Sequence, residues 1–375
     1  MNIFNAHNQW STRPADETFA SVKEMHEACS AYRSIASQAT VSLDTLRVEA
    51  NEGDLQLVGR VGVPAKLTNW AFSQLSQRAS APAGYLRDLP ATLAAQNLNH
   101  GLAAYARSTS DEEAKKVNLL FHKNGNLVLR AATSEIYSRI WNNEITGRLM
   151  GLQENQPNWT LPQAYVRESG SKGFDGLNGQ MAPRGAYASD HDMFCFLVDQ
   201  TRRVDVPGTE GGLYRGFFVW NSEVGASSFG MSLFLFDHVC GNHIVWGAKK
   251  IADFRIRHVG DASPKAFAGL AVELRRFAES STSDMQAKIG SARNLILGGT
   301  KEEVLDALLG KRIPELSKKR LSESYDLAEK ADRYGSPRSV WGMVNGITEL
   351  SQQSPHMDAR ISLDRAAGKL LEIAF

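Results

Sequence analysis

The stretch YRGFFVWNSEVGASSFGMSLFLFDHVCGNHIVWGAKKIADFRIRH, residues 214–258, decides the fold. Within MSLFLFDHVC, residues 231–240, successive side chains alternate between two faces, and both faces are mostly apolar. A strand with this pattern is typical of one that is buried on both sides. We therefore predict a central β-hairpin over residues 217–246, with a polar loop at residues 221–228 and a basic exit at residues 249–258.

Further strand patterns precede this hairpin. The run VNLLFHKNGNLVLRA, residues 117–131, has two apolar halves joined by Asn124-Gly125, a pair that tolerates the positive φ angles of a tight turn. DLQLVGRVG, residues 54–62, alternates in a mostly two-residue period, which indicates another strand. The chain before residue 263 is therefore rich in strands.

Helix signals dominate the rest of the chain. Thr300 with Glu303 forms a capping-box pattern, and Ser336-Pro337 is typical of a helix start. One earlier helix is expected over residues 17–36. A run of strands followed by a run of helices favours an α+β fold, with a central antiparallel sheet of hairpins and a helical C-terminal part, over a doubly wound parallel sheet.

The patterns divide the chain into three parts. We expect an N-terminal α/β segment at residues 1–110, a β-rich core at residues 111–262, and a C-terminal helical region at residues 263–375 that packs on the core. The core contains a long loop rich in Gly, Pro, Asn and Ser at residues 153–189, and loops of this length are often functional. Residues 133–149 fit either a helix or an irregular strand.

Composition excludes several classes of protein. The net charge of +1 provides no global field for nucleic acid or membrane, so electrostatic binding needs a local patch. Three cysteines are too few for a disulfide framework, and we find no signal peptide and no apolar run of membrane-spanning length. We predict a cytoplasmic protein with no membrane contact. No glycine-rich nucleotide motif is present, and we predict no cofactor.

One cluster of residues raises the question of an enzyme or a metal site. His238, Cys240 and His243 are zinc-ligand types, and Cys240-x-x-His243 has the spacing of half a site. Only His191 and Cys195 offer a second half, so we assign no metal. A Cys-His nucleophilic pair would need a stabilised thiolate, which the sequence does not indicate. An enzyme or metal-binding protein that uses this region is the alternative hypothesis.

The leading hypothesis is a surface for single-stranded nucleic acid, which combines a positive groove with aromatic side chains. Its basic and aromatic candidates are Arg130, Arg139, Trp141, Lys172, Arg184, Arg215, Lys249, Lys250, Arg255 and Arg257. The polar ends of the hairpin add Asn221, Ser222, Glu223, Asn242 and His243. The opposing interpretation is that these charges form a scattered, solvated surface.

Residues 221–247, 187–199 and 338–352 resemble the DUF932 family, uncharacterised proteins of phages, prophages and plasmids. The resemblance covers most of the chain and includes residues 76–90 and 132–145. The resemblance implies that the protein comes from a mobile element in a bacterial host. The sequence differs from the family pattern at His191, where the family more often has a basic residue. A β-hairpin followed by helices is also similar in outline to Rad52-like annealing proteins. This analogy implies a homo-oligomeric, non-enzymatic protein that binds single-stranded DNA in annealing or recombination. A structural or interaction protein of a phage is a further alternative.

Overall fold

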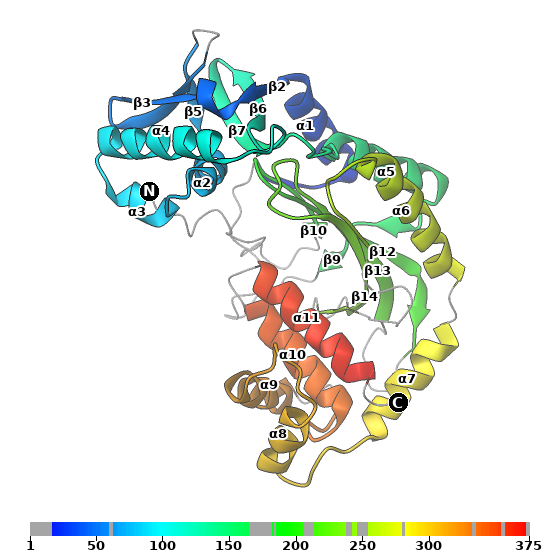
Figure 1. The fold of residues 1–375 in the computed structure, drawn as a ribbon. Coiled ribbons are helices and arrows are strands. Elements are labelled where there is room, and N and C mark those ends of the chain that lie inside the picture. The colour runs from blue at the N-terminus through cyan, green and yellow to red at the C-terminus, as the bar shows by residue number, and fades with distance from the viewer. Residues whose placement is uncertain are drawn as a thin grey trace.

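The computed structural model describes residues 17–59, 63–164, 182–183, 185–205, 213–237, 242–245, 254–279, 282–331, 335–353 and 357–372. These residues form an α+β structure with two large sheets, which confirms the predicted fold class. Figure 1 shows the curved strands β12, β13 and β14 lying between an N-terminal sheet and the C-terminal helices. Within the described part of the chain, no helix is long and apolar enough to cross a membrane.

The N-terminal sheet has six strands in the order β2-β6-β7-β5-β4-β3. Their bounds are β2 Ala36–Ser42, β3 Arg47–Asn51, β4 Asp54–Val58, β5 Ala65–Leu67, β6 Lys116–Asn124 and β7 Asn126–Ser134. The predicted hairpin over residues 117–131 is confirmed, and Gly125 makes its turn at a φ of 71°. Because β6 pairs with β2 and β7 pairs with β6, residues 116–134 belong to the N-terminal sheet. The domain boundary expected at residue 110 therefore lies within the part of the chain that forms this sheet.

Three helices accompany the N-terminal sheet, namely α2 Asn69–Arg78, α3 Ala83–Asp88 and α4 Ala91–Ser108. Leu75 of α2 and Leu98 of α4 share one hydrophobic core with Leu57 and Leu129 of the strands. Thr68 caps α2 by accepting a hydrogen bond from the backbone of Ala71. This arrangement leaves the opposite face of the sheet for contacts with the central part of the molecule.

The central sheet has eight strands, with the path β1-β11-β12-β13-β14-β15 and two side pairings, β16 with β14 and β8 with β12. The bounds are β1 Thr18–Phe19, β8 Trp159–Thr160, β11 Ala186–Ala188, β12 Met193–Val204, β13 Leu213–Asn221, β14 Phe229–Asp237, β15 Asn242–Val245 and β16 Phe254–Ile256. Strands β9 Gln163–Ala164 and β10 Ala182–Pro183 form a separate pair. The predicted core hairpin is confirmed as β13 and β14.

Both faces of this hairpin are buried, as its apolar pattern predicts. One face, with Phe217 and Leu233, packs in the largest core together with α1 Val22–Ser34 and α5 Asn142–Asn155. The other face carries a separate cluster composed mainly of aromatic side chains, Tyr187, Phe194, Phe196, Val198, Phe218, Trp220 and Phe234. Residues 133–149, whose sequence fits either a helix or a strand, contain the end of β7 and the start of α5.

The C-terminal part is helical, with α6 Ala262–Glu279, α7 Thr282–Asn294, α8 Lys301–Leu309, α9 Lys318–Ala331, α10 Val340–Gln353 and α11 Met357–Glu372. The predicted capping box is present, because Thr300 and Glu303 exchange side-chain and backbone hydrogen bonds. Trp341 of α10 is fully buried in the same large core as the central sheet. In Figure 1, α10 and α11 lie side by side near the end of β14.

Candidate functional site

The loop that joins β13 to β14, residues 222–228, is held from several sides. The Ser222 hydroxyl donates to the carbonyl of His191 at 2.6 Å and accepts from the backbone N–H of Ala226 at 2.9 Å. The carbonyl of Val224 accepts from Trp70 Nε1 at 2.9 Å and Gln74 Nε2 at 2.7 Å, both on α2. The loop therefore joins the central sheet to the N-terminal sheet and its helices.

Glu223 and Arg130 form a buried ion pair at this junction. Arg130 Nη1 donates to Glu223 Oε2 at 3.0 Å, and the two side chains are 3% and 4% exposed. The second carboxylate oxygen accepts from the backbone N–H of Asn142 at 2.8 Å. Asn142 is the first residue of α5, where the helix dipole favours a negative charge. Arg130 Nε also donates to the carbonyl of Asp190 at 3.0 Å, so this pair connects four separate segments.

His122 completes the polar cluster on the strand next to Arg130. Its Nε2 lies 2.9 Å from Arg130 Nη1 and accepts from it, because a guanidinium can only donate. Burial, followed by the charges of Arg130 and Arg139, lowers the pKa of His122 to about 3. The ring is therefore neutral at physiological pH. We call Arg130, Glu223, His122 and Asn142 the junction cluster.

A second group packs beside the junction cluster and has Arg139 at its centre. Arg139 Nε donates to Gln38 Oε1 at 3.1 Å, and its guanidinium lies 5.2 Å from the ring of Tyr137 and 5.6 Å from that of Trp141. Burial lowers the pKa of Arg139 to about 10. Arg33 covers Trp141 at 3.9 Å. The predicted basic and aromatic grouping exists, but it lies within the protein.

Tyr137 links this group to the segment that follows β16. Its hydroxyl donates to the carbonyl of Ser222 at 2.9 Å, and its ring stacks on His258 at 5.0 Å with an interplanar angle of 12°. His258 Nδ1 donates to the carbonyl of Ser138 at 3.2 Å, and the backbone N–H of Ser138 donates to the carbonyl of His258 at 2.9 Å. Burial lowers the pKa of His258 to about 4. The exit from β16 is thereby fixed to the junction.

Strand β16 and the residue that follows it present two of the candidate arginines to solvent. Arg255 and Arg257 are both exposed, and their alternate positions place them on one side of the extended segment. Arg255 pairs in register with Gly230, and its guanidinium lies 5.7 Å from the ring of Trp220. A Cβ at Gly230 would overlap this indole ring, so only glycine admits the observed packing. We call Arg255 and Arg257 the β16 arginines.

Substitution of Gly230 by alanine is expected to lower the free energy of unfolding by about 1–3 kcal/mol, because the new Cβ must displace the ring of Trp220. Urea unfolding of the purified variant measures the change. Gly290→Ala in α7 is the matched control, since the space around that Cβ is open and alanine favours a helix. Equal effects of the two substitutions would contradict the packing argument.

The predicted nucleic-acid residues thus separate into three groups. Arg130, Arg139, Trp141 and Arg215 are buried, which corrects their placement on an exposed surface. Arg130 and Arg139 are held by the internal contacts given above, and Arg215 lies opposite the buried Asp199 in the β12 and β13 register. The β16 arginines are exposed, and their role in binding nucleic acid stays a prediction. The remaining basic candidates, Lys172, Arg184, Lys249 and Lys250, lie outside the described residues.

The predicted polar residues Asn221, Ser222 and Glu223 lie close together, but they are buried inside the protein. Asn221 is fully buried, and its Nδ2 donates to the carbonyl of Ile140 at 2.9 Å and to Asn142 Oδ1 at 2.8 Å. Asn242 and His243 lie in β15, and their side chains are outside the described part of the structure. The contributions of Asn142 and His122 were missed by the sequence analysis. The one available signal was a histidine within the apolar strand NLLFHKN.

The residues proposed for chemistry are mostly buried or undescribed. Burial raises the pKa of the Cys29 thiol to about 12 and also raises that of Cys195, so neither favours a thiolate. Across the described ranges, no group of three or more His, Cys, Asp or Glu side chains could hold a metal ion. Cys240 and His238 lie outside those ranges. The alternative hypothesis of an enzyme or metal site there stays a prediction.

A Ser, His and Asp group at residues 189–192 also lacks the geometry of a catalytic triad. His191 Nδ1 lies 2.6 Å from Asp190 Oδ1 and 3.2 Å from Ser189 Oγ. A triad needs the acid and the nucleophile on opposite ring nitrogens, whereas both contacts here use Nδ1. The Ser189 hydroxyl donates instead to Asp192 Oδ1 at 2.6 Å. These contacts stabilise a turn between β11 and β12.

Comparison with known proteins gives one match. The sequence model of a family described as "Domain of unknown function (DUF932)" matches residues 180–367. The matched region begins before β11 and ends within α11, so it includes the β13 to β14 loop and the β16 arginines. No curated protein and no solved structure matches the chain significantly.

Proposed function

The chain belongs to the DUF932 family, and from this premise we propose that it is a non-enzymatic protein that binds single-stranded DNA through the β16 arginines. The observation that carries the proposal is the exposure of Arg255 on strand β16 and of Arg257 directly after that strand. Exposed guanidinium groups bind phosphate oxygens, and arginine does so with two parallel hydrogen bonds. The spacing of alternate residues on a strand suits neighbouring phosphates of an extended nucleic acid.

The surroundings of the β16 arginines support this role. The indole of Trp220 lies under the guanidinium of Arg255 and is itself only 7% exposed. It therefore orients the guanidinium through a cation–π contact. The stacked pair of Tyr137 and His258 fixes the chain just beyond Arg257. A fixed strand presents its cations at a lower entropic cost than a flexible loop does.

The proposal assigns the junction cluster a structural role. Arg130 and Glu223 neutralise each other inside the protein, so Arg130 offers no net charge to a phosphate. Participation in annealing or recombination, assembly into a homo-oligomer and an origin in a mobile element are part of the same proposal. The mobile element is implied by the family resemblance noted from the sequence, and annealing and oligomerisation by the likeness to annealing proteins. The β16 arginines are the part of it that a direct binding experiment addresses.

Binding of a fluorescent single-stranded oligonucleotide, measured by anisotropy across a salt series, tests the proposal. We expect the affinity to rise as salt is lowered. The slope of log K against log salt should decrease by about 0.7 for each phosphate contact that is lost, because single strands release their counterions to this extent. For the double variant Arg255→Ala, Arg257→Ala, which removes two such contacts, we therefore expect a slope that is smaller in magnitude by about 1.4.

The matched control removes two exposed arginines from the N-terminal part, Arg47→Ala and Arg107→Ala, with the same change in net charge. It should leave the slope unchanged. Absence of binding by the wild-type protein at low salt would contradict the proposed function. Equal slopes for the wild-type protein and the Arg255, Arg257 variant would show that any binding occurs elsewhere on the protein.

A further inference from the structure

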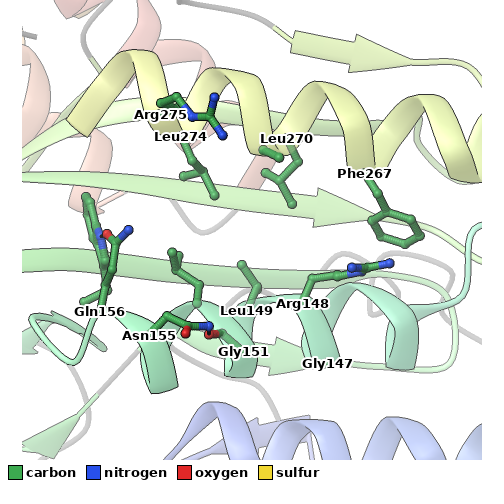
Figure 2. Close-up of a pocket in the computed structure, with 13 residues that line it drawn as sticks. Gly147, Arg148, Leu149, Gly151, Asn155, Gln156, Phe267, Leu270, Leu274 and Arg275 are labelled. Atoms are coloured by element: carbon green, nitrogen blue, oxygen red, sulfur yellow. Dashed lines mark hydrogen bonds between the residues drawn. The ribbon is translucent and has the colours of Figure 1, made fainter. Parts of the chain in front are cut away.

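A groove of about 710 Å³ runs between α5 and α6, and its lining residues include neither the β16 arginines nor the junction cluster. Figure 2 shows its floor and walls, in which Leu149 of α5 faces Leu270 and Leu274 of α6. Gly151 of α5 opens one wall, because no atom lies within 4 Å of the position that its Cβ would take. The groove is thus an apolar trough with a helix on each side.

Two arginines lie at the two ends of this trough. In Figure 2, Arg148 is next to Phe267 at one end and Arg275 follows Leu274 at the other. The guanidinium of Arg148 lies 5.3 Å from the ring of Phe267. Both arginines are exposed, and neither forms an ion pair with a carboxylate of the described residues. The trough therefore combines apolar walls with two exposed positive charges.

The open shape of the trough favours an amphipathic helix over a small apolar molecule as its ligand. A small apolar molecule binds well where most of its surface becomes buried. Here Asn155, Gln156 and Ala271 on the rim are exposed, so an occupant keeps one side in water. An amphipathic helix satisfies this condition, since it buries one apolar stripe and leaves its polar face solvated.

The dimensions agree with a helical occupant. The lining residues of α6 extend from Phe267 to Arg275, which is about 12 Å along a helix axis. On a helix lying in the trough, residues i and i+7 are about 10 Å apart and point to the same side. Acidic residues at these two positions would reach Arg148 and Arg275, and apolar residues at i+3 and i+4 would lie on the floor between them.

We propose that the groove between α5 and α6 binds an amphipathic helix of a partner protein, with acidic residues two turns apart on either side of an apolar stripe. The apolar stripe supplies the affinity, because burial of apolar surface is the main favourable contribution to association. The two arginines determine the direction of the helix and reject basic partners. This inference does not depend on the proposed DNA binding.

The test uses the full-length protein and a fluorescent, helix-forming 18-residue peptide with Glu at i and i+7 and Leu at i+3 and i+4. A second peptide carries Lys in place of both Glu residues. We expect saturable binding of the Glu peptide by anisotropy, and binding of the Lys peptide that is at least about tenfold weaker. The variant Arg148→Glu, Arg275→Glu should reverse this preference.

A steric variant locates the site. Because no atom lies near the position of a Cβ at Gly151, the variant Gly151→Leu should fold. Its leucine side chain would occupy the trough, so the variant should no longer bind the Glu peptide. The control Arg47→Glu, Arg107→Glu makes the same charge change elsewhere and should bind as the wild type does. No binding of the Glu peptide, or binding that Gly151→Leu leaves intact, would overturn the proposal. Displacement of the peptide by laurate at equal concentration would also overturn it, in favour of a small anionic amphiphile.

Discussion

Replacement of Glu223 by alanine is expected to lower the free energy of unfolding by about 3–5 kcal/mol. The carboxylate is 4% exposed and is bound by Arg130 and by the first backbone N–H of α5. Its removal leaves the guanidinium of Arg130 buried without a counter-charge, and a buried unpaired charge is among the most destabilising changes in a protein. Urea unfolding followed by circular dichroism measures the difference.

Two controls separate the buried pair from the loss of a carboxylate in general. Glu112→Ala removes a surface carboxylate that pairs with Lys115 and is 78% exposed, and we expect a change below about 1 kcal/mol. The double variant Glu223→Leu, Arg130→Met removes both charges and should be less destabilised than Glu223→Ala. If Glu223→Ala and Glu112→Ala cost the same, the pair does not stabilise the junction.

Acidification from pH 6.5 to 5 is expected to destabilise the protein through His122 and His258. Burial lowers their pKa values from 6.5 to about 3 and about 4. Below pH 6.5 the unfolded chain binds protons that the folded protein does not bind, so stability falls as pH falls. At pH 5 each histidine contributes a loss of roughly 2 kcal/mol, and the two together roughly 4 kcal/mol.

Unfolding free energies at pH 7 and pH 5 test this expectation. The double variant His122→Gln, His258→Gln lacks both titrating rings and should show a smaller difference between the two pH values than the wild-type protein. His100→Gln is the control, because His100 is exposed on α4. If the double variant and the wild-type protein lose the same stability on acidification, carboxylates account for the acid sensitivity and the two buried rings do not.

The local features of the fold were predictable because neighbouring residues determine them. Asn124-Gly125 gave the β6 to β7 hairpin, since the turn needs a residue that accepts a positive φ. Thr300 and Glu303 gave the start of α8, since both hydrogen bonds of the capping box form within four residues. The start of α5 was ambiguous, because no side chain of that segment caps the helix.

The candidate site was less predictable, because its partners are distant in the sequence. Arg130 and Glu223 are 93 positions apart, and Asn142 and Glu223 are 81 positions apart. A sequence pattern reports the type of a side chain but not the carboxylate that neutralises it. For this reason Arg130 and Arg255 looked equivalent as phosphate ligands, although one is buried in an ion pair and the other is exposed.

The sequence by itself determined the α+β class, the hairpin of β13 and β14 and the burial of both its faces, because period-two alternation and turn residues act over a few positions. Only the tertiary structure decided that the loop after β13 is an interior junction. It also decided which arginines remain at the surface. The physical reason is that burial and charge compensation depend on segments that meet only after folding, here β7, α5 and the loop between β13 and β14.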